Sequence, residues 1–391
     1  MRSAFAVWLI VASLIYAAVN YYVWVRLLRN TALSSRWQLV LSIVFVCLAM
    51  SVPAVFIGAR AFGLSFSFAF WPALLWSAVV VLLLFFLGST DLVRALVWLV
   101  QRLTNASSTV DPERRLFISR MIAGGATALS FGMVAYGARE ALGGVSVRRV
   151  AVTLGRLPAA LNGMTIAQIT DLHVGRGVGK SYVEEVVRQV NNLRPDIIAI
   201  TGDLADGSPA ELAEAVQPLA QLHASHGVYF VAGNHDHYSG IEPWKQFLRQ
   251  INIQVLHNQR VSIEHKGHFL ELAGVDDPAG ANNGGGPDVA AALAGVDPTR
   301  EVVLLAHRPS EIFAAAKEGV GLQLSGHTHG GQFWPFTWFA HLVFPYVSGL
   351  HQHDNTQIYV SRGAGYVGPP VRVGAPAELT LVELHSVEAT T

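Results

Sequence analysis

Cysteine is almost absent from this chain of 391 residues, in which Cys47 is the only one. It lies inside an apolar run, so the sequence offers neither a disulfide framework nor a thiolate metal site. Charge of one sign is lacking too, because 27 basic and 27 acidic residues give a formal net charge of zero. No global field attracts a polyanion, and we expect no nucleic-acid partner.

Charged residues and histidine are missing from three long apolar runs, at residues 4–25, 38–58 and 66–88. Each run is long enough to cross a hydrocarbon core, which takes about 20 apolar residues. A channel or an ion-coupled transporter usually places an ionisable group at mid-depth. The pattern therefore favours a membrane anchor, with the regulatory domain of a membrane transport subunit as an alternative.

A fourth, weaker apolar run covers residues 121–137 and follows Arg114 and Arg115. The arginine pair resembles a twin-arginine export signal placed inside the chain, and an ordinary fourth span fits equally well. Arginine-rich loops stay in the cytoplasm, which places the C-terminal part outside. We expect a cell-membrane protein with an all-α transmembrane region at 1–140 and an extracytoplasmic domain at 146–391.

From about Val145 onward, short β-rich runs alternate with helical stretches, the pattern of an α/β domain. Helical periodicity predicts helices at 182–193, 210–222 and 242–250. Five strands matter for function. They are predicted at 165–169, 197–201, 228–232, 302–306 and 322–325.

Polar side chains follow each of these five strands at once. They are Asp171 and His173, then Asp203, then Asn234, His235 and Asp236, then His307, and last His327 and His329. Ligands gather beyond the carboxyl ends of the strands in an open sheet, so we expect these side chains to converge. Glycines at 202, 233 and 326 are expected to give the backbone freedom for the turns.

The donors on offer are carboxylate and amide oxygens and imidazole nitrogens, without thiolate. This mixture suits Mn²⁺, Fe or Zn²⁺ better than Ca²⁺. Seven candidate ligands exceed the needs of one ion, and one shared carboxylate would let them hold two. Two cations about 3.5–4 Å apart form the clamp used in phosphoryl transfer.

The ordered set Asp171-x-His173, Gly202-Asp203, Gly233-Asn234-His235-Asp236, His307 and Gly326-His327-x-His329 resembles the motifs of calcineurin-like metallophosphoesterases. The longer segments at 326–332 and 361–365 resemble a narrower group, the transmembrane proteins with a metallophosphoesterase domain. The resemblance implies a four-layer α/β/β/α sandwich of two mixed sheets.

The resemblance also implies a role for each residue. One divalent metal would be held by Asp171, His173 and His329, the other by Asn234, His307 and His327, with Asp203 as the bridge. His235 would be a histidine that binds no metal and that stabilises or protonates the leaving oxygen, and Asp236 would orient its imidazole.

The implied activity is hydrolysis of a phosphate ester by metal-bound hydroxide, with monoester or phosphodiester left open. The membrane-associated group points to a phospholipid or a nucleotide-linked glycolipid as substrate. Aromatic residues crowd 333–346; they fit either a core or a surface facing lipid. A catalytically inactive metal-binding module is the main alternative.

Overall fold

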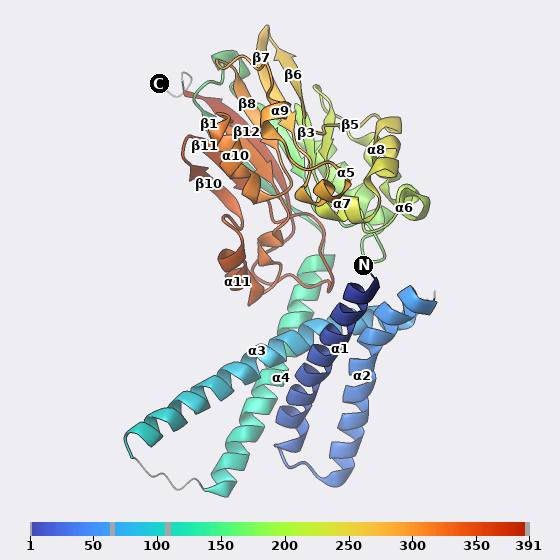
Figure 1. Ribbon diagram of the computed structural model, residues 1–391, viewed down its shortest axis with the longest axis vertical. Helices are drawn as coiled ribbons and strands as arrows, with labels where there is room; N and C mark the ends of the chain where they lie inside the picture. The colour runs from blue at the N-terminus through green and yellow to red at the C-terminus, as the bar shows by residue number, and fades with distance from the viewer. Residues whose placement is uncertain (1, 63–66, 106–110, 388–391) are drawn as a thin grey trace. The chain divides into compact units, whose positions relative to one another are not determined.

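The computed structural model describes residues 2–62, 67–105 and 111–387 (Figure 1). Residues 1, 63–66, 106–110 and 388–391, which lie within the regions expected from the sequence, fall outside these ranges. The chain divides into two compact units. One consists of Met1–Ala138 and Gly368–Val371, the other of Arg139–Val367 and Arg372–Thr391.

The first unit consists of long helices. They are α1 (Arg2–Trp24), which continues as a π-helix over Val25–Arg29, α2 (Ser35–Phe62), α3 (Ser67–Leu103) and α4 (Pro112–Leu142). Among the residues that the structure describes, four helical segments are long and apolar enough to cross a membrane, by length and composition. The weak fourth run of the sequence lies inside α4, a continuous helix of 31 residues. At 1.5 Å per residue, α4 is about 46 Å long.

The second unit is built on two mixed six-stranded sheets. The first sheet has the order β1 (Ser146–Leu154), β12 (Glu378–Ser386), β2 (Met164–Ile169), β3 (Ile197–Thr201), β4 (Val228–Val231) and β5 (Gln254–Val255). The second has the order β10 (Gly349–His353), β11 (Thr356–Val360), β9 (Leu322–Ser325), β8 (Glu301–Leu305), β7 (His268–Gly274) and β6 (Gln259–His265).

Helices cover the outer face of each sheet. Those on the first sheet are α5 (Lys180–Leu193), α6 (Pro209–Val216), the 3-10 turn η3 (Gln217–Gln221) and α8 (Ile241–Gln250). Those on the second sheet are α9 (Val289–Ala292) and α10 (Ile312–Lys317). The remaining short helices are η2 (Ala159–Leu161), α7 (Asn234–Tyr238), η4 (Pro278–Asn283), η5 (Pro309–Glu311), η6 (His329–Gly331) and α11 (Phe336–Val343).

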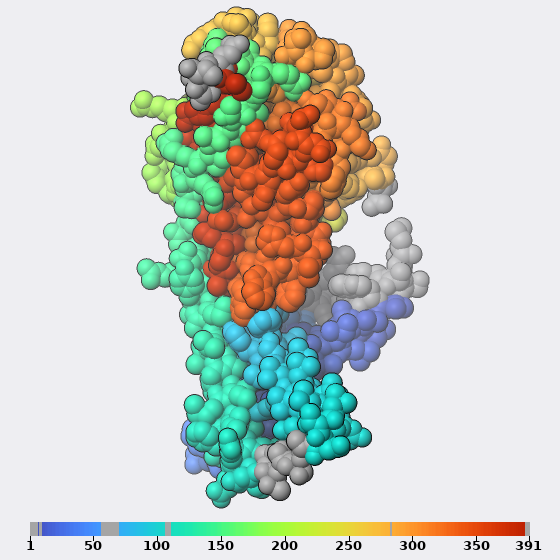
Figure 2. Space-filling view, turned by 90° about the vertical axis from the view of Figure 1, so that its left-hand side faces the viewer, coloured from blue at the N-terminus to red at the C-terminus, as the bar shows by residue number. Residues whose placement is uncertain are grey.

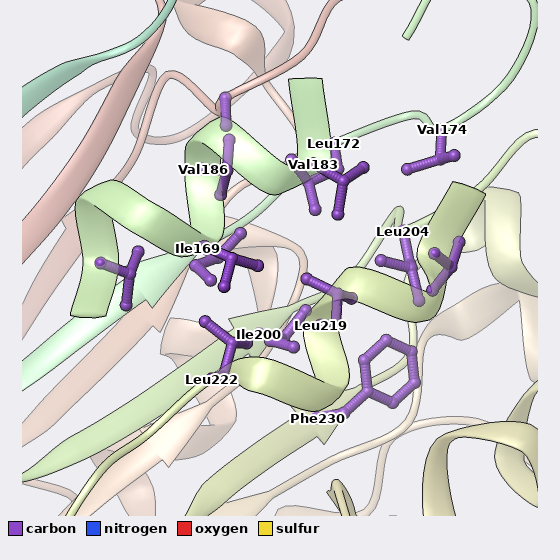
Figure 3. Packing of buried hydrophobic residues seen from close by; sticks show 14 of the residues in the cluster. Ile169, Leu172, Val174, Val183, Val186, Ile200, Leu204, Leu219, Leu222 and Phe230 are labelled. Carbon is purple, nitrogen blue, oxygen red and sulfur yellow. The ribbon is translucent and has the colours of Figure 1, made fainter. Parts of the chain in front are cut away.

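Hydrophobic cores separate the layers. The inner core joins the two sheets through side chains such as Ile166 and Leu322. The core between the first sheet and its helices contains Ile169, Ile200 and Phe230 (Figure 3). A third core, with Val302, lies between β8 and α9. The predicted α/β/β/α sandwich of two mixed sheets, preceded by a helical region, is therefore confirmed.

Sequence patterning explains the elements near the site. The buried face of α5 carries Val183, Val186, Val187 and Val190, the helical spacing that predicted a helix at 182–193. All five residues of β3 are buried, as expected for a strand covered on both faces. Each of the five predicted strands agrees with an observed strand to within one residue.

Two edges of the sandwich approach each other at the side seen in Figure 2. There the hairpin of β10 and β11, in orange-red, lies beside β1, in green. The Gln357 side chain on β11 donates a hydrogen bond of 2.6 Å to the carbonyl of Thr153 on β1. The polar residues predicted from the sequence follow other strands, which are β2, β3 and β4 in the first sheet and β8 and β9 in the second.

The topology determines where those polar residues meet. In the first sheet β2, β3 and β4 are parallel neighbours, and in the second β8 and β9 are parallel neighbours. Parallel neighbours end at the same edge of a sheet, so the segments after all five strands begin at corresponding edges.

Candidate metal centre

The backbone turns sharply where the polar side chains begin. Five of the seven predicted ligands adopt positive φ angles. These are Asp171 (54°), His173 (48°), Asp203 (51°), His327 (70°) and His329 (51°). Such residues cost roughly 1–3 kcal/mol each and cluster at functional sites, where the surrounding structure holds them in place.

Glycine is needed at the same turns for two different reasons. Gly202 has φ 88°, so there the expected backbone freedom applies. Gly233 has φ −106°, which any residue can adopt, but a Cβ there would lie 2.3 Å from Asp203 Oδ1. A Cβ on Gly326 would lie 2.2 Å from Asp171 Oδ2. At these two positions the small size of glycine matters, and the expectation of turn freedom was wrong.

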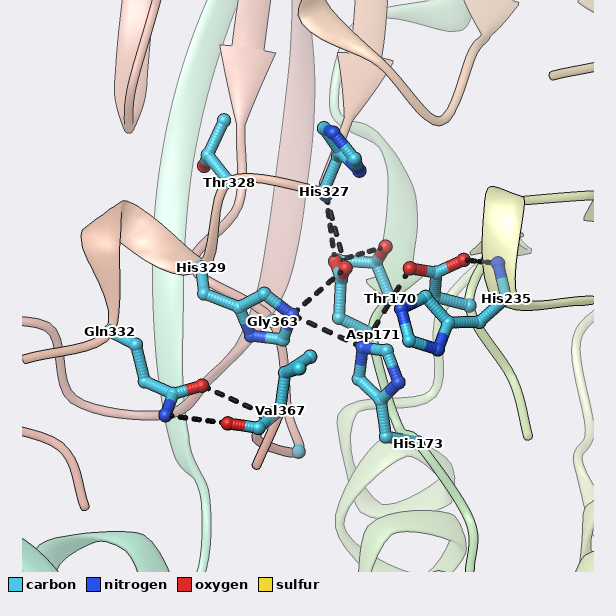
Figure 4. Close-up of polar contacts among 12 residues, drawn as sticks. Thr170, Asp171, His173, His235, His327, Thr328, His329, Gln332, Gly363 and Val367 are labelled. Atoms are coloured by element: carbon cyan, nitrogen blue, oxygen red, sulfur yellow. Dashed lines mark hydrogen bonds and ion pairs between the residues drawn. The ribbon is translucent and has the colours of Figure 1, made fainter. Parts of the chain in front are cut away.

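One group of converging side chains consists of Asp171, His173 and His329 (Figure 4). The Nε2 atoms of His173 and His329 are 3.1 Å apart, and His329 Nε2 is 3.4 Å from Asp171 Oδ1. All three residues are buried. Three donor atoms that face one another at these distances can share one cation.

A second group consists of Asp203, His307 and His327. His307 Nε2 lies 3.2 Å from Asp203 Oδ2 and 3.2 Å from His327 Nδ1. The other ring nitrogen of His307 is 2.9 Å from the carbonyl of Thr201, the arrangement that fixes the tautomer of a metal-binding histidine.

Asn234 begins α7 and is buried. Its side-chain oxygen Oδ1 is buried without a hydrogen-bond partner among the residues that the structure describes. A buried amide oxygen left unpaired is costly and calls for a missing partner, such as an ion. The atom therefore fits the role of an oxygen ligand.

The Asp203 carboxylate connects the two groups. Its Oδ2 lies 3.7 Å from His173 Nε2 as well as 3.2 Å from His307 Nε2. Its Oδ1 accepts a hydrogen bond of 2.8 Å from the backbone amide of His235. With a carboxylate shared between groups of buried oxygen and imidazole donors, the site fits two divalent cations.

Burial and mutual proximity perturb the titration of these groups. Burial opposes ionisation of Asp203, but His307 and His173 outweigh it and hold the pKa well below its usual range. Burial alone would depress the pKa of His307, yet the Asp203 carboxylate raises it to about 10. Burial and the neighbouring His307 lower the pKa of His327 to about 3. In effect Asp203 and His307 form an ion pair that a cation would replace.

Asp206 is the main residue that sequence reasoning missed. Its Oδ1 lies 2.7 Å from His235 Nδ1 and 3.0 Å from His173 Nδ1. Burial lowers the pKa of His235, but the hydrogen bond to Asp206 outweighs it, so the pKa is raised overall. The sequence did offer a signal for this residue, because Asp206 is an acidic residue only three positions after Asp203, in the segment that follows β3.

Asp236 differs from its expected role. Its carboxylate accepts hydrogen bonds from the backbone amides of Asp203 (2.9 Å), Leu204 (2.9 Å) and Gly233 (2.8 Å). The carboxylate within hydrogen-bond distance of the His235 imidazole belongs to Asp206 instead. Asp236 therefore holds two strand-end loops together, and the expected contact with the imidazole was wrong.

Arg372 was missed as well, because nothing near it in the sequence marks it. The side chain is buried and donates to the carbonyls of Ala375 (2.8 Å) and Arg362 (2.9 Å). The carbonyl of Gly365, which Arg372 also contacts, belongs to a segment whose amide donates to Asp171 O. Arg372 thus fixes the glycine-rich segment behind the first group of ligands.

Comparison with known proteins agrees with this geometry. The family model for calcineurin-like phosphoesterases matches residues 164–331, a stretch that contains both groups of converging side chains. A bovine transmembrane protein with metallophosphoesterase domain is 37% identical over 323 residues, covering 79% of this chain and 72% of that protein. The chain belongs to the calcineurin-like metallophosphoesterase family.

Other known proteins match this metallophosphoesterase over a larger or a smaller share of its length. An uncharacterised metallophosphoesterase of Campylobacter jejuni is 29% identical over 385 residues, 97% of this chain and 98% of that protein. Among solved structures, a dimetal phosphatase from Danio rerio aligns with 57% of this chain and 93% of that one. It is 13% identical and has a TM-score of 0.38.

Proposed function

We propose that this metallophosphoesterase hydrolyses a phosphate ester at a two-cation centre while its N-terminal helices anchor it in a membrane. The observation that carries the proposal is the Asp203 carboxylate, which lies between the His173 and His307 imidazoles. A single carboxylate between two such groups is what a pair of bridged cations requires. Two divalent cations, when bound, activate water and stabilise the charge of an in-line displacement at phosphorus.

The proposed ligands follow the two groups. Asp171, His173 and His329 hold one cation, Asn234, His307 and His327 hold the other, and Asp203 serves both. Manganese, iron or zinc suits this donor set. His173 and His307 each turn one nitrogen toward the site and the other toward an oxygen behind it. Their rings are therefore oriented before any cation binds.

His235 is proposed as the proton donor to the leaving oxygen. Its Nδ1 faces the Asp206 carboxylate, which leaves Nε2 as the nitrogen that can present a proton. The side chain is 30% exposed, so a substrate can reach it. Because its pKa is raised, the imidazole keeps this proton closer to neutral pH, as general acid catalysis needs.

A lipid-linked phosphoester is the proposed substrate class, either a phospholipid or a nucleotide-linked glycolipid. The apolar side chains of α11 are unusually open, with Trp338 68%, Leu342 82% and Val343 74% exposed. Directly after α11, the Phe344 ring stacks edge-on against His327, 5.5 Å between centroids. This helix thus offers lipid chains a surface next to the metal centre.

The division of the chain is part of the proposal. Residues 1–140 form the transmembrane region and 146–391 the catalytic domain, which faces the outside of the cell. The unbroken α4 supports a retained fourth span over a cleaved export signal. Tags at the two ends of the protein should accordingly stay on one polypeptide of full length in the membrane fraction.

The test uses full-length protein in detergent, stripped of metal and supplied with Mn²⁺, Zn²⁺ or Mg²⁺ in turn. We expect about two ions per chain and turnover of soluble and lipid phosphoesters. Asp203→Asn should lose metal and activity together, whereas Asp354→Asn, whose side chain is 82% exposed, should keep both. Bound metal without turnover of any ester would instead identify an inactive metal-binding module.

A further inference from the structure

A cavity of about 720 Å³ lies within the helical unit, far along the chain from the metal ligands. Residues from the end of α1, the last turns of α3 and the start of α4 line it. They are Arg26, Asn30, Arg94, Trp98, Pro112, Arg115, Leu116, Ile118 and Ser119. Figure 1 shows the end of α1 and the start of α4 at the same end of this helical unit.

Three arginines line this cavity, and two of them pair with the carboxylate of Asp91, which is not itself a lining residue. Asp91 Oδ1 lies 2.9 Å from Arg26 Nη2 and 3.6 Å from Arg94 Nη1. The other oxygen of Asp91 accepts a hydrogen bond of 2.7 Å from Tyr22. Arg115 has no acidic partner in the described part of the chain. One negative charge against three positive charges leaves the cavity with a net charge of about +2.

The side chain of Arg26 gives a second indication that an anion binds in this cavity. Its side chain is only 13% exposed, and its Nε is buried without a hydrogen-bond partner among the described residues. A buried donor on a charged group that is left unsatisfied is costly. The Asp91 carboxylate satisfies Nη2 and does not reach Nε, so an acceptor is missing on this side of the guanidinium.

We propose that this cavity binds a phosphate-bearing anion. Arginine pairs with phosphate through two parallel hydrogen bonds, and here Nε of Arg26 and the free guanidinium of Arg115 supply donors. Basic pockets between transmembrane helices bind the head groups of anionic lipids. Trp98, Leu116 and Ile118 provide an apolar wall for the remainder of a lipid, and free phosphate would use the arginines alone.

The experiment measures binding to full-length, detergent-purified protein by native mass spectrometry. Three probes are titrated, namely phosphatidylglycerol, phosphatidylcholine and inorganic phosphate. We expect phosphatidylglycerol to bind more tightly than phosphatidylcholine, whose choline cancels the charge of the phosphate. Binding of inorganic phosphate in place of phosphatidylglycerol would identify a soluble anion as the ligand of the same site.

Variants separate this site from diffuse surface charge. Arg94→Gln and Arg115→Gln should each weaken binding about fivefold. Arg114→Gln is the matched control, because Arg114 is exposed beside Arg115 and does not line the cavity. Asp91→Asn should act in the opposite direction and tighten binding, since it removes the carboxylate that pairs with Arg26 and Arg94.

The proposal is overturned if Arg114→Gln weakens binding as much as Arg115→Gln, or if phosphatidylcholine binds as well as phosphatidylglycerol. Unchanged binding in all the arginine variants would overturn it too. Melting temperature and turnover of a soluble aryl phosphate are measured on each variant, and both should stay unchanged. These controls keep a folding defect from imitating loss of the anion.

Discussion

At the scale of single residues, the Asp206 carboxylate acts on two histidines of different function. It lies 2.7 Å from Nδ1 of His235 and 3.0 Å from Nδ1 of His173. The first contact sets the charge of the proposed proton donor, and the second orients a proposed metal ligand. Asp206 is therefore a positioning residue whose loss should change both pH dependence and metal affinity.

Asp206→Asn should shift the pH profile of turnover. The hydrogen bond to Asp206 raises the pKa of His235, so its removal lets burial lower that pKa. His235 then loses its proton at lower pH, and the alkaline limb of kcat/KM moves toward acid. Loss of the second contact should weaken metal affinity about 10- to 100-fold.

The readout is kcat/KM against pH at saturating metal, together with metal titration at fixed pH. Asp288→Asn serves as the control, since Asp288 caps α9 away from the metal centre. An alkaline limb that stays in place in Asp206→Asn would contradict the assigned contact, whatever the loss of rate.

The convergence of the polar side chains that follow the five strands could be predicted from the sequence, and the structure brings most of them together. Asp171 and His329 lie 158 positions apart, yet their placement after strands was a signal that they would meet, and their side chains are 3.4 Å apart. Contacts that follow from no strand-end motif gave no such signal. Arg372 was invisible, because its role depends on four carbonyl groups whose positions no local pattern reveals. Asp236, to which the family resemblance assigned the His235 imidazole, instead accepts hydrogen bonds from the backbone amides of Asp203, Leu204 and Gly233.

At the scale of elements, the turns that follow the strands leave no room for a larger residue beside the proposed metal ligands. Gly326 follows β9, and a Cβ there would meet both Asp171 Oδ2 and Thr170 Oγ1 at 2.2 Å. Real Cβ atoms never approach so closely, so the carboxylate must move. The turn and the ligand are thus one structural unit.

Gly326→Ala should therefore reduce metal content and turnover together, with little effect on the distant sheet. Gly179→Ala is its matched control, because Gly179 has φ −99° and nothing lies within 4 Å of an added Cβ. Alanine there should leave the metal content at the level of the parent, with at most a small loss of stability because Gly179 caps α5. Normal metal content in Gly326→Ala would show that the Asp171 carboxylate can move aside and still hold the cation.

The helix α11 provides the second prediction at this scale. Replacing Trp338 and Leu342 by Ala removes exposed apolar surface without opening a core, since these side chains are 68% and 82% exposed. At about 25 cal/mol per Å² of apolar area, a contact of 100 Å² with lipid contributes about 2.5 kcal/mol.

Turnover of a phospholipid or glycolipid phosphoester in vesicles should accordingly fall more than tenfold, while turnover of a soluble aryl phosphate stays constant. Phe313→Ala is the matched control, an aromatic residue that is 49% exposed on α10. Equal loss on both substrates would refute a lipid-contacting role and would indicate that α11 contributes only to the stability of the fold.

Helices and strands could be predicted from the sequence where buried residues recur at a regular spacing. The buried valines of α5 and the apolar run of β3 carry their own periodicity, and both were located within two residues. Strand order carries no such signal. The parallel pairing of β1 with β12 joins Ser146 to Glu378, and only packing of the complete unit selects it.

At the scale of the whole molecule, the charge of the connecting segments predicts orientation. Arginines flank the connection between α1 and α2, and Arg114 and Arg115 begin α4. If these segments stay in the cytoplasm, as basic loops do, the single span α1 places the N-terminus outside. The fourth span then delivers the metal centre to the outside as well.

Cysteine labelling tests this orientation, because Cys47 is the only cysteine to remove. In a Cys47→Ser background, Glu318→Cys places a thiol on the exposed end of α10, and Ser34→Cys places one between α1 and α2. A membrane-impermeant maleimide should label the first in intact cells and the second only after lysis. The reverse pattern would put the metal centre in the cytoplasm, where its substrate would have to lie on the inner leaflet.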